Sequence, residues 1–132
     1  KKIYLAGPLF SESEVRDRRE QAQELRDMGF EVYNPIEAND EIGLVYDKLY
    51  LLDIEAMEAC DIGIINADNL DSGTIAELGW LVAKEKQVYT LWTNWKSNTP
   101  PNLFVTGLAT QGNNKIFNSN ETLMSYLREN HK

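Results

Sequence analysis

The chain has 132 residues, a formal net charge of −8 and one cysteine, Cys60. This length is typical of a single domain, which we expect over residues 1–132. The negative charge argues against nucleic acid or an anionic membrane as a partner. No apolar stretch is long enough to span a bilayer. A single cysteine cannot form an internal disulfide, which favours a reducing compartment such as the cytoplasm.

Short apolar runs alternate with helical periodicity in the first part of the chain. The run over residues 3–6 is predicted to be a central strand that ends at Gly7, where the backbone can turn sharply and a ligand can approach closely. Apolar residues recur at helical spacing from Glu12 to Met28, which predicts a helix. Phe30–Tyr33 is predicted to be the second strand, and this β-α-β order favours a parallel sheet.

The middle of the chain is predicted to contain a loop, a helix and a buried strand. Residues 37–43 are polar and are interpreted as a loop, whereas residues 44–60 have helical periodicity. Residues 62–65 form an apolar run flanked by polar residues, which is typical of a buried parallel strand. The side chains predicted to face the core from the helix are Val45, Leu49, Leu52 and Ala56.

The rest of the chain continues the alternation. A polar loop from Asn66 to Asp71 leads to a helix that Ser72 can cap. The whole pattern predicts an α/β fold with a doubly wound, mostly parallel sheet of about five strands. The later elements are expected at 87–92 and 114–117 (strands), near 121–129 (helix) and at 102–107 (short helix or loop).

Three carboxylates are candidates for chemistry, and two of them, Asp71 and Glu77, are predicted to lie at or just beyond the carboxyl edge of this sheet, where ligands bind in open α/β folds. Glu77 lies on the helix after the central loop, and Asp71 precedes that helix. Asp53 lies at the margin of an apolar stripe, where burial would raise its pKa and suit a general acid. Purely structural roles stay open for all three: an exposed helical glutamate, a helix cap and a surface aspartate.

Two aromatic residues are candidates for the same site. The Tyr4 hydroxyl could donate to a carboxylate such as Glu77, and Phe10 could stack on a flat base, although either ring could also be an ordinary core aromatic. No G-x-G-x-x-G or P-loop pattern is present, which disfavours dinucleotides and nucleoside triphosphates. The single histidine, His131, lies at the terminus, so no metal site is expected.

The sequence resembles the nucleoside 2-deoxyribosyltransferase family in four segments, which occur in the family's order. The resemblance implies a flavodoxin-like (Rossmann-like) three-layer α/β sandwich and no cofactor. The segments are IYLAGPLF from Ile3, DIEAMEACD from Asp53, DSGTIAELG from Asp71 and PNLF from Pro101.

The resemblance implies roles for individual residues. Glu77 matches a nucleophile that attacks the anomeric carbon of deoxyribose, Tyr4 matches the tyrosine that holds it, and Asp53 matches the acid that protonates the departing base. Asp71 matches a carboxylate that accepts the sugar 5′-hydroxyl. Asn102 resembles an asparagine that reaches a neighbouring subunit's sugar, which implies a homo-oligomer with shared active sites. The implied substrate-binding residues are Asp71, Gly7, Phe10, Gly73 and Asn102.

The expected activity is transfer of 2-deoxyribose between nucleobases through a covalent glycosyl-glutamate intermediate, in nucleoside salvage. The expected partners are nucleosides and free nucleobases. A rival within the family is a hydrolase of deoxynucleoside 5′-monophosphates, whose members carry a small hydroxyl residue where this chain has Asp71. Ser11, Ser72 and Arg16 could help to bind such a phosphate. The same fold could also serve a non-catalytic nucleoside-binding module or a flavin-binding electron carrier.

Overall fold

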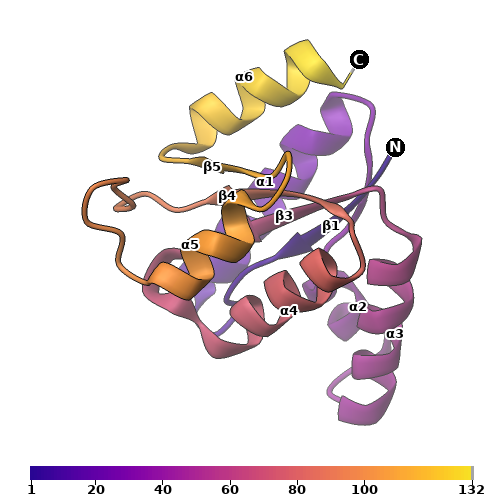
Figure 1. Ribbon diagram of the computed structural model, residues 1–132. Helices are drawn as coiled ribbons and strands as arrows, with labels where there is room; N and C mark the ends of the chain where they lie inside the picture. The colour runs from indigo at the N-terminus through magenta and orange to yellow at the C-terminus, as the bar shows by residue number, and fades with distance from the viewer. Residues whose placement is uncertain (132) are drawn as a thin grey trace.

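A five-stranded parallel sheet forms the centre of the protein, in the order β2-β1-β3-β4-β5. The computed structural model describes residues 1–131, and the arrangement is visible in Figure 1. The predicted α/β class is therefore confirmed. The strands are β1 (Lys2–Ala6), β2 (Glu31–Tyr33), β3 (Ile62–Asn66), β4 (Gln87–Leu91) and β5 (Lys115–Phe117).

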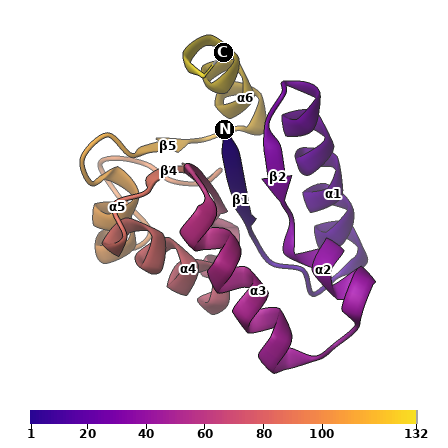
Figure 2. The same cartoon turned by 90° about the vertical axis from the view of Figure 1, so that its right-hand side faces the viewer.

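Helices cover both faces of the sheet, which gives the expected three layers (Figure 2). One face packs against α1 (Glu12–Asp27) and α6 (Asn120–Asn130). The other face packs against α3 (Tyr46–Ala59), α4 (Ser72–Ala83) and α5 (Leu103–Thr110). Successive side chains of a strand point to opposite faces, so β1 contributes to both cores.

The alternation along β1 decides which residues can reach a site under α3 and α4. Ile3 and Leu5 pack with α1 and α6, whereas Tyr4 and Ala6 pack on the other face. In β2, Tyr33 is the parallel partner of Tyr4 and lies on the same face. Strand β3 is buried along its whole length, as its apolar sequence predicts.

Residues 37–43, interpreted as a loop, lie largely within a helix, α2 (Pro35–Ile42). Pro35 at the start of α2 fixes a backbone angle suited to the first helical turn, and Ala38 is buried beneath it. The polar residues that suggested a loop hold α2 against α1 instead. Arg26 forms an ion pair with Glu37 at 2.6 Å. Composition alone could not distinguish this short helix from a loop.

The prediction that Val45 faces the core was wrong. Val45 precedes α3 as its N-cap residue and is 37% exposed. Leu49, Leu52 and Ala56 are half-buried, and the buried residue of α3 is Met57. The first turns of α3 extend beyond the sheet (Figure 2), so the apolar side chains there have no core to enter.

Asp71, rather than Ser72, is the N-cap of α4. The Asp71 carboxylate accepts hydrogen bonds from the Thr74 backbone nitrogen (3.0 Å) and the Thr74 hydroxyl (2.8 Å). The ambiguous segment after residue 101 is a helix, α5, with Asn102 as N-cap. None of the helices in residues 1–131 combines the length and apolar character needed to cross a membrane.

Candidate active site

A small cleft lies at the carboxyl end of β1, beside the start of α4. Its volume is about 180 Å³. It collects the loop after β1, the aspartate of α3 and the first turns of α4, which are far apart in sequence. This is the edge at which open α/β sheets bind ligands. The lining residues are Gly7, Pro8, Leu9, Phe10, Pro35, Asp53, Asp71, Gly73, Thr74 and Glu77.

Glu77 and Tyr4 are in direct contact at the floor of this cleft. The Tyr4 hydroxyl donates a hydrogen bond to Glu77 Oε2, and the Tyr4 side chain is fully buried. Glu77 Oε1 accepts no hydrogen bond from residues 1–131 and belongs to a residue that lines the cleft. The tyrosine therefore fixes one carboxylate oxygen and leaves the other for a ligand.

Asp53 has a tyrosine partner of its own, which the sequence did not predict. The Tyr33 hydroxyl donates to Asp53 Oδ1 at 2.8 Å. The Tyr33 ring is stacked on the Tyr4 ring, with centroids 5.5 Å apart and planes 14° apart. The sequence signal for this contact was that both tyrosines lie on strands predicted to be parallel. Residues that are paired on neighbouring strands have adjacent side chains on the same face of the sheet.

Burial controls the acidity of these groups. Burial raises the pKa of Glu77 to about 7; the Tyr4 hydrogen bond opposes this change, and the nearby charges of Asp53 and Asp71 add to it. Burial also raises the pKa of Asp53, and the Tyr33 hydrogen bond lowers it. The pKa of each tyrosine is raised, chiefly by burial, so both hydroxyls keep their protons and act as donors.

Gly7 is required by close packing below the cleft. A Cβ atom at this position would lie 2.9 Å from Arg18 Nη1 and 3.0 Å from Asn66 Cβ. The Asn66 amide donates to the Ala6 carbonyl oxygen at 2.9 Å and exchanges hydrogen bonds with the Gln21 amide. This buried amide pair holds the end of β1, and no sequence motif predicted it.

The other predicted ligand residues differ in position. Asp71 Oδ2 is used as the helix cap, whereas its Oδ1 accepts no hydrogen bond within residues 1–131. Gly73 and Phe10 line the cleft, and the Phe10 ring is 85% exposed. Asn102 is exposed and does not line the cleft of its own chain. Its side chain caps α5 through the Val105 backbone nitrogen at 3.0 Å.

The family model described as nucleoside 2-deoxyribosyltransferase matches residues 3–120. The chain belongs to the nucleoside 2-deoxyribosyltransferase family. A relative in Ureaplasma parvum serovar 3, the uncharacterised protein UU063, is 42% identical, and the match covers 72% of this chain and 72% of that protein. The family assignment confirms the resemblance in the four sequence segments.

Two solved structures connect the family fold to activities. A 2-deoxyribosyltransferase from Bacillus psychrosaccharolyticus is 28% identical, with a TM-score of 0.74 over 96% of this chain and 92% of that chain. The CMP N-glycosidase BcmB of Clostridium botulinum is 26% identical, with a TM-score of 0.70 over 96% and 97% of the two chains. The family thus acts on N-glycosidic bonds, as transferases or as glycosidases.

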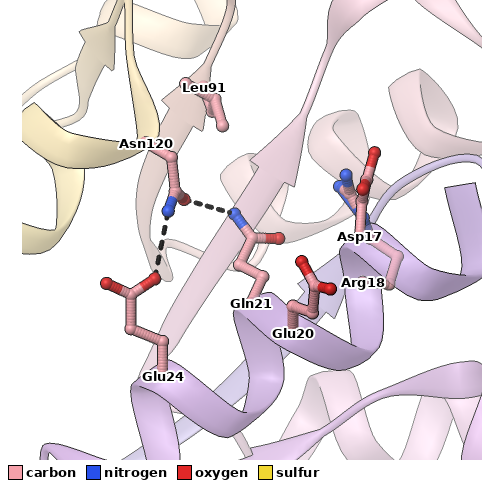
Figure 3. A pocket seen from close by; sticks show the side chains of 7 residues that line it. All are labelled: Asp17, Arg18, Glu20, Gln21, Glu24, Leu91 and Asn120. Atoms are coloured by element: carbon pink, nitrogen blue, oxygen red, sulfur yellow. Dashed lines mark hydrogen bonds between the residues drawn. The ribbon is translucent and has the colours of Figure 1, made fainter. Parts of the chain in front are cut away.

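A second cavity, of about 300 Å³, lies outside the candidate active site of this deoxyribosyltransferase-family member (Figure 3). It lies between α1 and the start of α6. Gln21 donates to Asn120 Oδ1 and Asn120 donates to Glu24 Oε1, both at 3.1 Å, so these side chains largely satisfy one another. Within residues 1–131 no three histidine, cysteine, aspartate or glutamate side chains gather to hold a metal ion.

Proposed function

We propose that this protein is a nucleoside 2-deoxyribosyltransferase of nucleoside salvage, which moves 2-deoxyribose between nucleobases. The observation that carries the proposal is the Glu77 carboxylate, held by the buried Tyr4 hydroxyl in a cleft that also contains Asp53 and Asp71. A binding module would need no nucleophile at this position. Family membership supports chemistry at an N-glycosidic bond.

In the first half-reaction Glu77 is the nucleophile. Its free oxygen forms a bond to C1′ of the sugar while the bond from C1′ to the base nitrogen breaks, and the electron pair stays on the base. Asp53 donates its proton to that base. The transition state has oxocarbenium character, so the negative charge of Glu77 stabilises it before the bond is complete.

In the second half-reaction a different base attacks C1′ of the glycosyl-Glu77 ester. The Asp53 carboxylate takes the proton that the incoming base loses, and Glu77 leaves as a carboxylate. Both half-reactions use the same two groups in opposite directions, which predicts ping-pong kinetics. Water in place of the second base would give hydrolysis. The residues assigned here need no metal or organic cofactor.

Asp71 favours nucleosides over nucleoside monophosphates. Its Oδ1 atom is free to accept a hydrogen bond from a 5′-hydroxyl, whereas a 5′-phosphate at this position would meet a negative charge. Hydrolysis of deoxynucleoside 5′-monophosphates is the second candidate, because a relative over nearly the whole chain is named as a CMP N-glycosidase.

The site is proposed to be shared between the subunits of a homo-oligomer. A cleft of about 180 Å³ is smaller than the pockets that usually enclose a ligand of nucleoside size. Phe10, Leu103 and Phe104 expose 85%, 78% and 77% of their surface, which an isolated chain would leave in water. Asn102 begins the helix that carries two of these residues, so a subunit docked there could bring it to its partner's sugar.

Base exchange tests the proposal directly. The protein is incubated with deoxyinosine and adenine, and separately with a deoxynucleoside 5′-monophosphate alone. The proposal requires deoxyadenosine in the first reaction. Base release from the monophosphate without exchange on the nucleoside would instead establish the hydrolase. Glu77→Ala should abolish turnover and retain nucleoside binding, whereas full turnover by this variant would contradict the assigned nucleophile.

A further inference from the structure

We propose that Tyr33 is a positioning residue, which determines the carboxyl oxygen from which Asp53 delivers its proton. The inference rests on the proposed function, because it assumes that Asp53 is the acid. It concerns a residue outside the four segments through which the chain resembles its family. Tyr33 acts on the reaction only through Asp53.

The hydrogen bond between the two residues is directional. Tyr33 donates to Asp53 Oδ1 over 2.8 Å, so Oδ1 is occupied as an acceptor. A proton on Asp53 is then held on Oδ2, which has no hydrogen bond within residues 1–131. Because Asp53 lines the cleft, this arrangement presents a single acidic oxygen to a base.

Stacking fixes the position of the Tyr33 hydroxyl. Tyr4 and Tyr33 are directly paired in the parallel ladder of β1 and β2, and their rings lie nearly parallel. The Tyr4 hydroxyl contacts Glu77, whereas the Tyr33 hydroxyl contacts Asp53. Two adjacent rings therefore hold the nucleophile and the acid separately.

The groups around Asp53 are acidic or neutral. Tyr4 faces it from β1, Tyr33 from β2 and Glu77 from α4, and Glu55 is a further acidic neighbour of Tyr33 on α3. Glu77 also faces Asp71. The four ion pairs formed within residues 1–131 involve none of these groups. The Tyr33 hydrogen bond is thus what stabilises the Asp53 carboxylate as its proton leaves.

Protons and charge balance between Asp53 and the base. The proton moves from Asp53 Oδ2 to the departing base nitrogen, which receives the electron pair of the breaking bond to C1′. Asp53 becomes a carboxylate, and the hydrogen bond donated by Tyr33 stabilises its negative charge. In the return step the incoming base gives its proton to the same oxygen, so Tyr33 keeps one geometry throughout.

Tyr33→Phe and Tyr4→Phe form a matched pair of tests, because each removes one hydroxyl and keeps the ring. The reaction needs Glu77 ionised and Asp53 protonated, so the two carboxyl groups together must hold one proton. The rate therefore falls at low pH, where both are protonated, and at high pH, where both are ionised. Tyr33→Phe raises the pKa of Asp53 and should move the acidic limb of kcat/KM to higher pH by about one unit. Tyr4→Phe removes the donor that lowers the pKa of Glu77, so it should move the alkaline limb, expected near pH 7 in the wild type, to higher pH.

An unchanged acidic limb in Tyr33→Phe, with the alkaline limb moved in Tyr4→Phe, would overturn the inference and leave the proposed function intact. Equal loss of rate at every pH in Tyr33→Phe would assign Tyr33 a merely structural role and also overturn it. If wild-type protein neither exchanges nor releases a base, the proposed function fails. NMR titration of the Asp53 carboxyl carbon, in wild type and Tyr33→Phe, measures the pKa of Asp53 without requiring activity. Equal pKa values in the two proteins would overturn the inference.

Discussion

The Tyr4 hydroxyl and the Glu77 carboxylate form a partly buried hydrogen bond between residues that are 73 positions apart in the chain. Tyr4 reaches Glu77 because it points to the face of the sheet that α4 covers. The bond fixes one carboxylate oxygen and lowers a pKa that burial would otherwise raise further. A carboxylate held in this way is oriented, partly ionised at neutral pH and shielded from water, which suits a nucleophile.

Tyr4→Phe should lower kcat by about 10- to 100-fold, because Glu77 loses both its orientation and the donor that favours its ionised form. The KM for the deoxynucleoside should change little, since Tyr4 is buried beneath Glu77. Initial rates of base exchange at pH 6, below the alkaline limb, measure both constants. A variant with wild-type kcat at this pH would show that the hydrogen bond does not contribute to the reaction.

The contact between Tyr4 and Glu77 could be anticipated from the sequence, because the β-α-β order brings the central strand that carries Tyr4 and the helix that carries Glu77 to the same edge. The position of Tyr33 on a predicted strand parallel to that of Tyr4 was a partial signal, but the contact also depends on the pairing register of β1 and β2, which one sequence does not specify. Helix α2 was missed because its polar residues bind α1, a tertiary contact that composition does not reveal.

A slow donor should trap the proposed intermediate on Glu77. A 2′-fluorinated 2′-deoxynucleoside destabilises the oxocarbenium-like transition state, so the glycosyl ester should form and then persist. Intact-mass spectrometry should detect one added sugar per chain, and peptide mapping should place it at Glu77. Glu77→Gln is the matched control and should show no added mass. An adduct on any other residue would refute the assignment of the nucleophile.

Glu77→Gln should stabilise the protein at alkaline pH. Burial raises the Glu77 pKa from 4.5 to about 7, so between these values the folded state holds a proton that the unfolded state has lost. The free energy of unfolding of the wild type therefore falls as pH rises through this window, by up to about 3 kcal/mol. The glutamine variant has no such loss, and its Oε1 atom can still accept from Tyr4.

Urea denaturation at pH 5 and pH 8 tests this prediction. The variant should be more stable than the wild type at pH 8 and close to it at pH 5. The exposed Glu129→Gln substitution is the control for the change of residue type. A wild type that is more stable than Glu77→Gln at pH 8 would mean that the ionised Glu77 carboxylate does not destabilise the folded state.

Asp71→Ser should shift preference from nucleosides toward nucleoside monophosphates. Serine can still cap α4 through the Thr74 backbone nitrogen, so the helix should remain in place. The negative charge near the 5′ position is lost, along with a strong acceptor for the 5′-hydroxyl. We expect about a 10-fold or greater fall in kcat/KM for deoxyinosine and a rise in base release from its 5′-monophosphate. Asp71→Asn, which removes the charge but keeps an acceptor, should lie between these values. Unchanged preference in both variants would show that Asp71 does not contact the 5′ group.

Glu77→Ala and Asn102→Ala chains should restore activity to each other when mixed. If each site takes Glu77 from one subunit and Asn102 from its partner, a mixed dimer contains one complete site and one doubly altered site. Random mixing of two such subunits then gives about a quarter of wild-type activity, whereas each variant alone stays inactive. Phe104→Glu places a charge on a side chain that is 77% exposed in one chain, and it should convert the oligomer to monomers in light scattering. Recovery of activity in the mixture would require sites that cross the interface, and its absence with an intact oligomer would confine each site to one chain.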